Sequence, residues 1–542
     1  MKRFNMLALY FHTLRYMKFS QVYWKLYYHF KKNYPVITSR PKLRSLVGNW
    51  IAPISKQVSL VGERKFCFLN ESHEINSPVD WNNPSYEKLW LYNLHYFDDL
   101  NAKDAYLRRQ QHNNIIDLWV KDNAPGKGNG WEPYPTSLRI VNWIKWSIIG
   151  NCLNDVQSQS LATQVRFLFR KLEWHLLGNH LFANAKALVF AGLFFEGDEA
   201  DKWLRKGLSI IDQQIPEQVL KDGGNFELSP MYHVIFLEDS LDLINIARVY
   251  QNKNLQYLEE IITRMITWLQ VMMHPDGQIS FFNDCAFGVA ADPVQIFDYV
   301  KRLNIASKKI SEGIVTLDES GYIRIENSNA VVIFDCAKVG PDYIPGHAHA
   351  DSLSFECSLF GKRVVVNSGT SCYGVSEERL RQRSTEAHST VSIDDENSSE
   401  VWGGFRVARR ANPINLKVSK DNQFYQVSCA HNGYLRLKGE PMHTREICLD
   451  DDFLIVKDII DGVFKKAVGR IFLHPQVSVE VNEDKTSGML LFDGYSVSWQ
   501  LNNAEVLIRK SSYHPEFGNS EESICIEYLI MKNRSEFVVK WN

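Results

Sequence analysis

The chain has 542 residues, which at about 100–200 residues per domain suggests about two to four domains. Hydrophobic residues make up 45% and charged residues 23%, a globular composition that excludes a disordered, collagen-like or coiled-coil chain. The 61 Lys and Arg against 63 Asp and Glu give a net charge of −2, which argues against a nucleic-acid-binding protein, because such proteins usually carry a basic excess.

Cysteine usage and the N-terminus indicate the compartment. Nine cysteines are scattered without a CxxC pair, which predicts neither a disulfide framework nor a cysteine zinc site and favours a reducing compartment. The N-terminal segment is a basic, aromatic, amphipathic helix whose apolar run, Met6–Phe11, is broken by His12, Arg15 and Lys18. We therefore expect no signal peptide, no transmembrane segment and a cytoplasmic protein. The helix either packs on the protein body or makes peripheral contact with a membrane surface.

Helical periodicity dominates the first half of the chain. Apolar residues at three- and four-residue steps predict a helix over 161–177 that Gly178 stops, followed by a helix over 181–195 that Asn179 caps. Further helices are predicted at 138–149, 235–250 and 257–273. Repeated helix–loop–helix units of this kind predict antiparallel hairpins, stacked or closed into a toroid.

After about residue 312 the hydrophobic period changes to two. Short strands are expected at 322–325, 330–334, 352–357, 363–366, 390–393, 416–418, 424–427, 447–456 and 524–530. Polar turns between them are typical of an antiparallel sandwich. The sequence thus predicts an α-then-β protein of two domains, a helical one over 1–312 and a β domain over 313–542.

Two polar motifs lie at predicted helix starts. Asn179-His180 begins one helix, with Asn184 one turn further on the face of His180, and a helix start favours a bound anion. Tyr232-His233 precedes another helix, and a Tyr beside a His can transfer protons if the phenol's pKa is lowered. A capping Asn and a core Tyr are the structural alternatives.

The segment Gly-His347-Ala-His349-Ala-Asp351 leads into a predicted strand. A period of two would place these three side chains on one face, which indicates a metal site or an active site. Asn367, Tyr373 and His388 follow as further partners. A nearby basic cluster either binds an anionic ligand or is a solvated face; its members are Arg379, Arg381, Arg383, Arg406, Arg409 and Arg410.

In this order the motifs resemble the heparinase II/III-like polysaccharide lyases. The similar segments are NHLFANAKALVFAGLFF, ELSPMYH, GHAHADSLSFE, GKRVVVNSGTSCYG and RSTEAHSTVSID, with HTLRYMKFSQVYWKL and WEPYPTSLRIVNWIKW upstream. The resemblance covers about residues 10 to 410, and the remainder carries only a strand pattern. It implies an incomplete (α/α) toroid followed by an antiparallel β-sandwich, and β-elimination of a uronate-containing polysaccharide.

The resemblance also implies roles for single residues. Asn179 matches the Asn that neutralises the uronate carboxylate, and His180 the adjacent His that neutralises it or acts as a base. Tyr232 matches the catalytic base and acid, whose phenolate is made accessible by positive charge. His347 matches a catalytic His, and Tyr373 a second active-site Tyr. Substrate binding is expected from Asn184, Arg139, Glu227, His233 and Arg383.

A structural zinc in the β domain is a further implication of the resemblance. His349 and His388 match two ligands, and Asn367 occupies the third position, where the family has Asp. An amide is a weak, neutral ligand, so the site is weakened and Asn367→Asp is expected to tighten it. Asp351 is either a substitute ligand or a partner of one.

Three functions remain open at this point. The first is a lyase acting on an acidic polysaccharide, in capsule or O-antigen metabolism because no export signal is seen, with its sugar cleft where toroid and sandwich meet. The second is a glycoside hydrolase of the toroid type, using two carboxylates among Glu132, Asp222, Glu227, Asp276 and Asp284. The third is a non-catalytic glycan-binding protein of surface-polysaccharide assembly.

Overall fold

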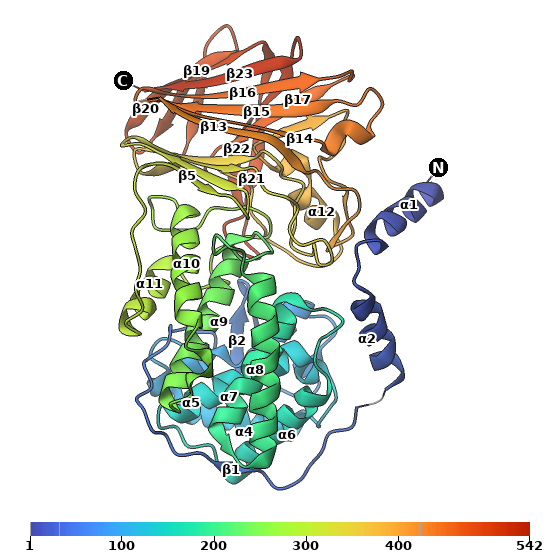
Figure 1. The fold of residues 1–542 in the computed structure, drawn as a ribbon, viewed down its shortest axis with the longest axis vertical. Coiled ribbons are helices and arrows are strands. Elements are labelled where there is room, and N and C mark those ends of the chain that lie inside the picture. Colours follow the sequence, from blue (N-terminus) through green and yellow to red (C-terminus); the bar gives the residue numbers. More distant parts are fainter. Residues whose placement is uncertain (1, 32, 422–423, 542) are drawn as a thin grey trace.

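The computed structural model describes residues 2–31, 33–421 and 424–541. A helical domain is followed along the chain by a β domain, and the two are stacked along the long axis of the molecule (Figure 1). Helices α1 (Lys2–Leu14) and α2 (Phe19–Phe30) lie beside this stack. The order confirms the predicted fold class, an incomplete helical toroid followed by antiparallel sheets.

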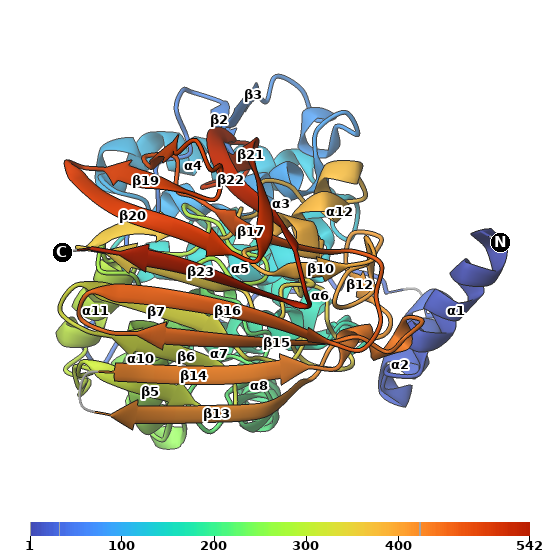
Figure 2. The same ribbon diagram turned by 90° about the horizontal axis from the view of Figure 1, so that it is seen from above.

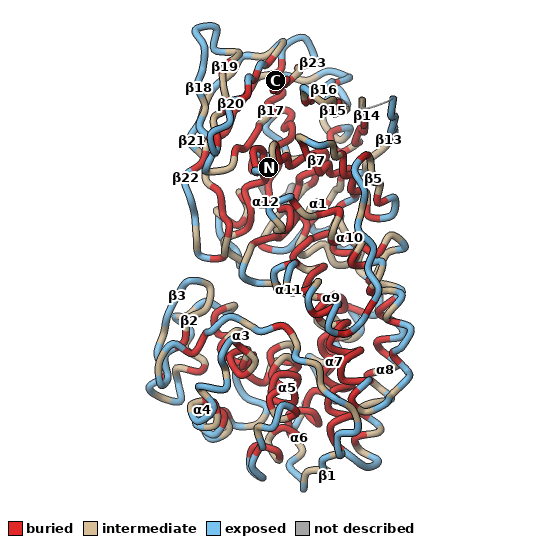
Figure 3. The backbone as a smooth tube through the Cα atoms, turned by 90° about the vertical axis from the view of Figure 1, so that its left-hand side faces the viewer, coloured by how far each residue is buried: buried red, intermediate tan, exposed pale blue. Residues whose placement is uncertain are grey.

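The helical domain is built around α7 (Gly178–Phe194). Almost every residue of α7 is buried, because α5, α6, α8 and α9 all pack against it (Figure 3). The other helices are α3 (Lys88–Tyr96), α4 (Arg109–Asp122), α5 (Pro133–Ile148), α6 (Asp155–Arg170), α8 (Asp198–Gln218), α9 (Pro230–Val249), α10 (Leu258–Val271) and α11 (Pro293–Arg302). Short pairs β1 (Lys42–Leu43) with β4 (Phe195–Glu196) and β2 (Lys65–Phe68) with β3 (Glu71–Glu74) complete it.

The chain between α6 and α7 differs from the prediction. Helix α6 ends at Arg170, and 171–177 is a loop, because Asn184 Oδ1 accepts a hydrogen bond from the Glu173 backbone N–H at 2.8 Å and turns the chain back. Helix α7 begins at Gly178, so Asn179 lies in its first turn and does not cap it. Gly178 has a φ of +53°, and a Cβ there would meet Ile344 Cδ1 at 2.9 Å, so the position requires glycine.

The β domain consists of antiparallel sheets, which Figure 2 shows from above. A five-stranded sheet runs in sequence order through β5 (Gly313–Leu317), β6 (Tyr322–Glu326), β7 (Ala330–Asp335), β8 (Phe355–Leu359) and β9 (Lys362–Val365). An eight-stranded sheet has the order β13 (Pro413–Asp421), β14 (Phe424–His431), β15 (Met442–Leu449), β16 (Phe453–Asp461), β23 (Arg534–Lys540), β20 (Tyr495–Asn502), β19 (Ser487–Phe492) and β18 (Ser478–Val481). A four-stranded sheet has the order β10 (Val391–Ile393), β17 (Ala467–Phe472), β22 (Glu521–Ile530) and β21 (Ala504–Tyr513).

Two predictions about strands are wrong, because a turn or a loop replaces part of the expected strand. The strand expected at 447–456 is a hairpin of β15 and β16, closed at Asp450, whose N–H donates to the Phe453 carbonyl at 3.0 Å. Strand β8 begins at Phe355, so His347, His349 and Asp351 lie on a loop and not on one face of a strand. The β domain also contains β11 (Val401–Trp402), β12 (Arg406–Val407) and α12 (Glu377–Arg383).

The N-terminal helices pack on both domains. Trp402 Nε1 of the β domain donates to Thr13 Oγ1 of α1 at 3.0 Å, and Trp24 of α2 stacks on Trp174 of the helical domain with ring centroids 6.1 Å apart. The expected helix is therefore two helices, with one side of each against the body. Among the residues that the structure describes, no helix has both the length and the apolar character needed to span a bilayer.

Candidate active site at the domain junction

Tyr232 and His347 meet where the helical domain adjoins the β domain. Tyr232 lies in the first turn of α9, where its backbone N–H donates to Ser229 Oγ at 3.2 Å and caps the helix. His347 lies on the loop before β8. Their ring centroids are 3.8 Å apart, and both side chains are partly exposed. The two halves of the chain thus place a phenol and an imidazole in contact at an accessible position.

A second tyrosine extends this pair. The Tyr373 hydroxyl lies 2.8 Å from the Tyr232 hydroxyl, and the Arg379 guanidinium stands 5.0 Å from the centroid of the Tyr373 ring. Burial raises the pKa of Tyr232 well above its usual range, and Tyr373 and Asp284 raise it further. The expected phenolate made accessible by positive charge is therefore not the state of the free protein. Tyr232 keeps its proton and is suited to act as an acid.

Asp284 contacts both His347 and His349. Its Oδ2 accepts from His347 Nδ1 at 2.9 Å, its Oδ1 accepts from His349 Nε2 at 2.8 Å, and both oxygens pair with Arg379. Burial alone would raise the pKa of Asp284, but the Arg379 guanidinium holds it well below the usual range. A carboxylate that accepts from Nδ1–H leaves Nε2 of His347 with a lone pair, as a general base requires.

Asn179 and His180 lie in the first turn of α7. The Asn179 amide makes no hydrogen bond within the described residues, and its side chain is half-buried. His180 Nδ1 lies 3.1 Å from Glu173 Oε1, and the Tyr134 ring packs at 4.5 Å. Burial opposes protonation of His180, but the Glu173 carboxylate outweighs it and raises the pKa. An amide and a readily protonated imidazole at a helix N-terminus form a setting suited to a carboxylate.

Glu227 connects the two groups of residues. Its carboxyl group receives the backbone N–H of Asn179, and its Oε2 lies 3.5 Å from His347 Nε2 without a hydrogen-bond partner in the described structure. Burial raises the pKa of Glu227 against the opposing effect of His347. Glu227 thus links the first turn of α7, through the Asn179 backbone, to His347 of the Tyr232–His347 pair.

The other predicted substrate-binding residues lie inside the protein. Arg139 is fully buried and donates to Gln164 and to the His95 and Gly130 carbonyls, with its guanidinium on the Trp119 ring. Asn184 is fully buried and holds Glu173. His233 bonds to Met265 O and Asn225 N, and Arg383 to the Ala348 carbonyl. These placements correct the expectation of sugar contact, because no polymer reaches a fully buried side chain.

The arginine cluster is used mainly within the protein. Arg379 pairs with Asp284, Arg381 with Glu378, Arg409 with Glu400 and Arg410 with Asp342, while Arg383 donates to carbonyl groups. Arg406 lies over the Trp402 ring at 4.7 Å. The cluster therefore stabilises loops around the site, and Arg379 is the member that pairs with Asp284, the partner of His347 and His349.

The carboxylate pair of a hydrolase is not assembled here. Glu132 accepts from Lys88 and Tyr92, Asp222 from Ser320, and Asp276 from Arg363. Glu227 and Asp284 flank the same histidine, but both oxygens of Asp284 are taken by Arg379 and the two histidines. An inverting or retaining pair needs two carboxyl groups facing the sugar.

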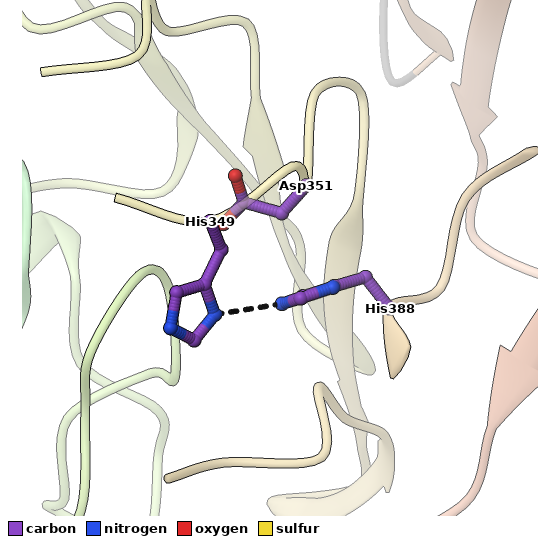
Figure 4. A group of neighbouring side chains, drawn as sticks. All are labelled: His349, Asp351 and His388. Carbon is purple, nitrogen blue, oxygen red and sulfur yellow. Dashed lines mark hydrogen bonds between the residues drawn. The ribbon is translucent and has the colours of Figure 1, made fainter. Parts of the chain in front are cut away.

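His349, Asp351 and His388 form a buried group beside the site, with one ligand atom from each lying within 4.8 Å of the others (Figure 4). His349 Nε2 faces Asp284 Oδ1, and His388 Nδ1 faces the Ser384 carbonyl at 2.8 Å, so both nitrogens must carry hydrogen. Burial lowers the pKa of His349 to about 4 and lowers that of His388. In the neutral rings, the remaining lone pairs then face each other at 3.0 Å, an arrangement that a cation would satisfy.

Asn367 has a different role from the one expected. Its amide nitrogen donates to the Phe281 carbonyl at 2.8 Å, and its oxygen accepts from the Ser389 N–H at 3.3 Å. Both side-chain atoms of Asn367 thus hold backbone segments, whereas Asp351 stands with His349 and His388 in a group that could hold a metal ion. Two histidines and a carboxylate are ligands that zinc prefers.

From the sequence, no role was assigned to Glu173, Arg379 was placed only in the basic cluster, and Asp284 was named only among the carboxylates of a hydrolase. Glu173 lies in a segment predicted as helix, and 95 residues separate Asp284 from Arg379. The clustering of arginines after Tyr373 was one sequence signal, but it was interpreted as either a site for an anionic ligand or a solvated face, and not as the partner of a buried carboxylate.

Comparison with known proteins matches both domains of the chain to one protein family, heparinase II/III. A family model described as "Heparinase II/III N-terminus" matches residues 155–302, and one described as "Heparinase II/III-like, C-terminal" matches residues 310–542. A heparin-sulfate lyase of Bacteroides stercoris is 26% identical over 325 residues, covering 55% of this chain and 46% of the relative. That of Pedobacter heparinus is 28% identical over 253 residues, covering 41% and 36%. The matches span less than half the length of these relatives.

Solved structures extend the similarity of fold over most of the chain. A heparinase III structure has a TM-score of 0.66 at 16% identity and covers 87% of this chain and 79% of its own. The heparan sulfate lyase HepC from Pedobacter heparinus has a TM-score of 0.58 at 17% identity, with 88% and 81% covered. At this identity the likeness concerns the fold, a helical toroid followed by an antiparallel β domain.

Proposed function

Because the chain belongs to the heparinase II/III-like family, we propose that it is a polysaccharide lyase that cleaves a uronate-containing polymer by β-elimination. The observation that carries the proposal is the contact of Tyr232 with His347, whose ring centroids lie 3.8 Å apart although they come from different domains. Heparin-sulfate lyases among the relatives support this class of reaction.

Neutralisation of the uronate carboxylate is assigned to Asn179 and His180. The Asn179 amide is unpartnered within the described residues, and the Glu173 carboxylate favours the protonated form of His180. A hydrogen bond and a positive charge on the carboxylate stabilise the carbanion-like state that forms when C5 loses its proton.

His347 and Tyr232 carry the two proton transfers of the elimination. His347 Nε2 takes the C5 proton, because Asp284 accepts from Nδ1–H and stays ionised beside Arg379. The C4–O4 bond breaks as the C4–C5 double bond forms, and the protonated Tyr232 hydroxyl gives its proton to O4. Tyr373, 2.8 Å away, can return a proton to Tyr232.

We further propose that His349, Asp351 and His388 hold a structural zinc ion. The facing lone pairs of the two imidazoles and the nearby carboxylate support this assignment. Bound zinc would brace the loop that carries His347, since Asp284 contacts both His347 and His349. The elimination itself uses no metal ligand.

Within uronate polymers, we propose an unsulfated surface polysaccharide of the capsule or O-antigen type. The support is electrostatic: of the six arginines of the basic cluster, Arg379, Arg381, Arg409 and Arg410 are paired with carboxylates, which leaves fewer cations for sulfate groups. Incubation with capsular polymers, hyaluronan, alginate and heparan sulfate, followed by ultraviolet absorbance, tests the proposal. A lyase leaves a 4,5-unsaturated uronate that absorbs, a hydrolase leaves fragments that do not, and a binding protein leaves no fragments.

A further inference from the structure

The outer faces of α1 and α2 expose an unusual amount of apolar surface. On α1, Leu7 and Phe11 are 67% and 66% exposed, and Leu14 follows on the same face. On α2, Phe19, Leu26 and Phe30 are 83%, 55% and 80% exposed. Spacings of three, four and seven residues place each set along one helical stripe, here called the N-terminal apolar stripe. Exposing such large apolar side chains to water is unfavourable, so a stripe of this kind indicates a surface that binds a partner.

The opposite faces of both helices are already occupied. Thr13 bonds to Trp402, and Trp24 stacks on Trp174, while the side chains of the apolar stripe are exposed to solvent. Figures 1 and 2 show α1 and α2 along one side of the body. Lys18 pairs with Glu217 and lies 3.8 Å from the Tyr343 ring centroid, which fixes the junction between the helices. The exposed stripe is thus held on the protein in a defined orientation.

The positive charge of the N-terminal segment indicates which kind of partner binds this stripe. The first 62 residues contain eleven Lys or Arg and no Asp or Glu, in a chain whose net charge is −2. Arg15, Lys25 and Lys31 are exposed beside the apolar side chains. Basic side chains flanking a stripe of Phe and Leu match an anionic bilayer surface, where apolar groups enter the acyl boundary and cations meet lipid phosphates.

We propose that α1 and α2 dock this protein on the surface of an anionic membrane. The helices lie in the interface with Leu7, Phe11, Phe19, Leu26 and Phe30 inserted, and neither helix spans the bilayer. Because α2 contacts Trp174, one residue after Glu173, docking also holds the candidate active site near the membrane. A polymer attached to that membrane is thereby brought within reach.

Vesicle sedimentation of the full chain tests the docking. We expect binding to vesicles of phosphatidylcholine mixed with phosphatidylglycerol, little binding to phosphatidylcholine alone, and release as salt is raised. The triple variant Phe11→Ser, Phe19→Ser and Leu26→Ser should bind about a hundredfold more weakly. A matched variant that removes exposed apolar side chains elsewhere, Tyr106→Ser, Leu107→Ser and Val463→Ser, should bind like the wild type.

Three results would overturn the proposal. They are failure of the wild type to bind the anionic vesicles, equal binding by the triple variant, and a wild-type dimer that the triple variant converts to a monomer without any vesicle binding. Vesicle binding requires no turnover, so its outcome is separate from the lyase proposal. Cleavage of a soluble polymer should be equal for the wild type and the triple variant.

Discussion

Asp284 Oδ2 accepts a hydrogen bond from His347 Nδ1 at 2.9 Å while the same carboxylate pairs with the buried Arg379. This relationship makes Asp284 both an orienting group for the proposed base and the counter-charge of an arginine that has no exposure to water. Loss of the carboxylate therefore affects two properties that can be measured separately.

We predict that Asp284→Asn lowers the free energy of unfolding by about 3–5 kcal/mol, because Arg379 is left as an uncompensated buried charge. Urea unfolding measures the loss. The double variant Asp284→Asn, Arg379→Met should recover part of this loss, since it removes the orphaned cation. Equal stability of Asp284→Asn and the wild type would contradict the buried ion pair.

The effect of Glu173 on His180 gives a prediction on pH dependence. The Glu173 carboxylate raises the pKa of His180, so Glu173→Gln should lower it. If protonated His180 neutralises the substrate carboxylate, the alkaline limb of the rate profile should move to lower pH in this variant. The control is Glu199→Gln, a carboxylate paired with Arg166 in a different part of the domain, which should leave the profile unchanged. An unshifted limb for Glu173→Gln would remove His180 from this role.

Histidines buried without charge predict a loss of stability in acid. Burial lowers the pKa of His95 and of His233 to about 3 in the native state, against about 6.5 when unfolded. Below about pH 6.5 the unfolded chain therefore binds protons that the native chain does not, and each such histidine costs about 1.4 kcal/mol per pH unit. The contribution is fully present above the unfolded pKa. Urea unfolding at stepped pH should show the free energy of unfolding falling from neutral pH toward pH 5, and a flat profile would contradict it.

The metal prediction rests on His349, Asp351 and His388. Elemental analysis of the purified protein should find zinc, and both a chelator and His388→Ala should lower the melting temperature. Asn367→Asp, expected from sequence to tighten the metal, should instead destabilise the fold by about 1–3 kcal/mol, because its carboxylate would face the Phe281 carbonyl. Metal-free protein with a melting temperature indifferent to chelators would contradict the site.

Sequence patterns predicted the fold class and the helices α5, α7, α9 and α10, because hydrophobic periods of 3.6 and two reflect which faces are buried. They did not predict α4, α8, β20, β21 or β23. The patterns were less reliable where a single hydrogen bond or a tight turn ends a helix or strand inside an apolar stretch. Helix α6 ends early because Asn184, fourteen residues beyond Arg170, binds the Glu173 backbone. The strand expected at 447–456 is interrupted by a tight turn at three consecutive Asp residues, 450–452.

Sequence motifs singled out Asn179, His180, Tyr232, His347 and Tyr373, and their catalytic roles stay a prediction. In the structure Tyr232 contacts His347 and Tyr373, and Glu227 meets His347 and the Asn179 backbone. For other polar residues near these motifs, the sequence does not show whether the side chain is buried or faces a ligand. Arg139 and Arg383 satisfy buried carbonyl groups, and a sequence does not distinguish such an arginine from one that faces a ligand. Asp284 is recognised only when the fold brings its partners together.

The most direct test of the central claim is the ultraviolet absorbance released from uronate polymers by the wild type and by Tyr232→Phe. The substitution removes one hydroxyl and keeps the ring against His347, so the melting temperature should change little. We predict that the wild type generates 4,5-unsaturated products from at least one polymer and that Tyr232→Phe is slower by about a hundredfold or more. Cleavage without absorbing products, or a Tyr232→Phe variant with the wild-type rate, would contradict the account.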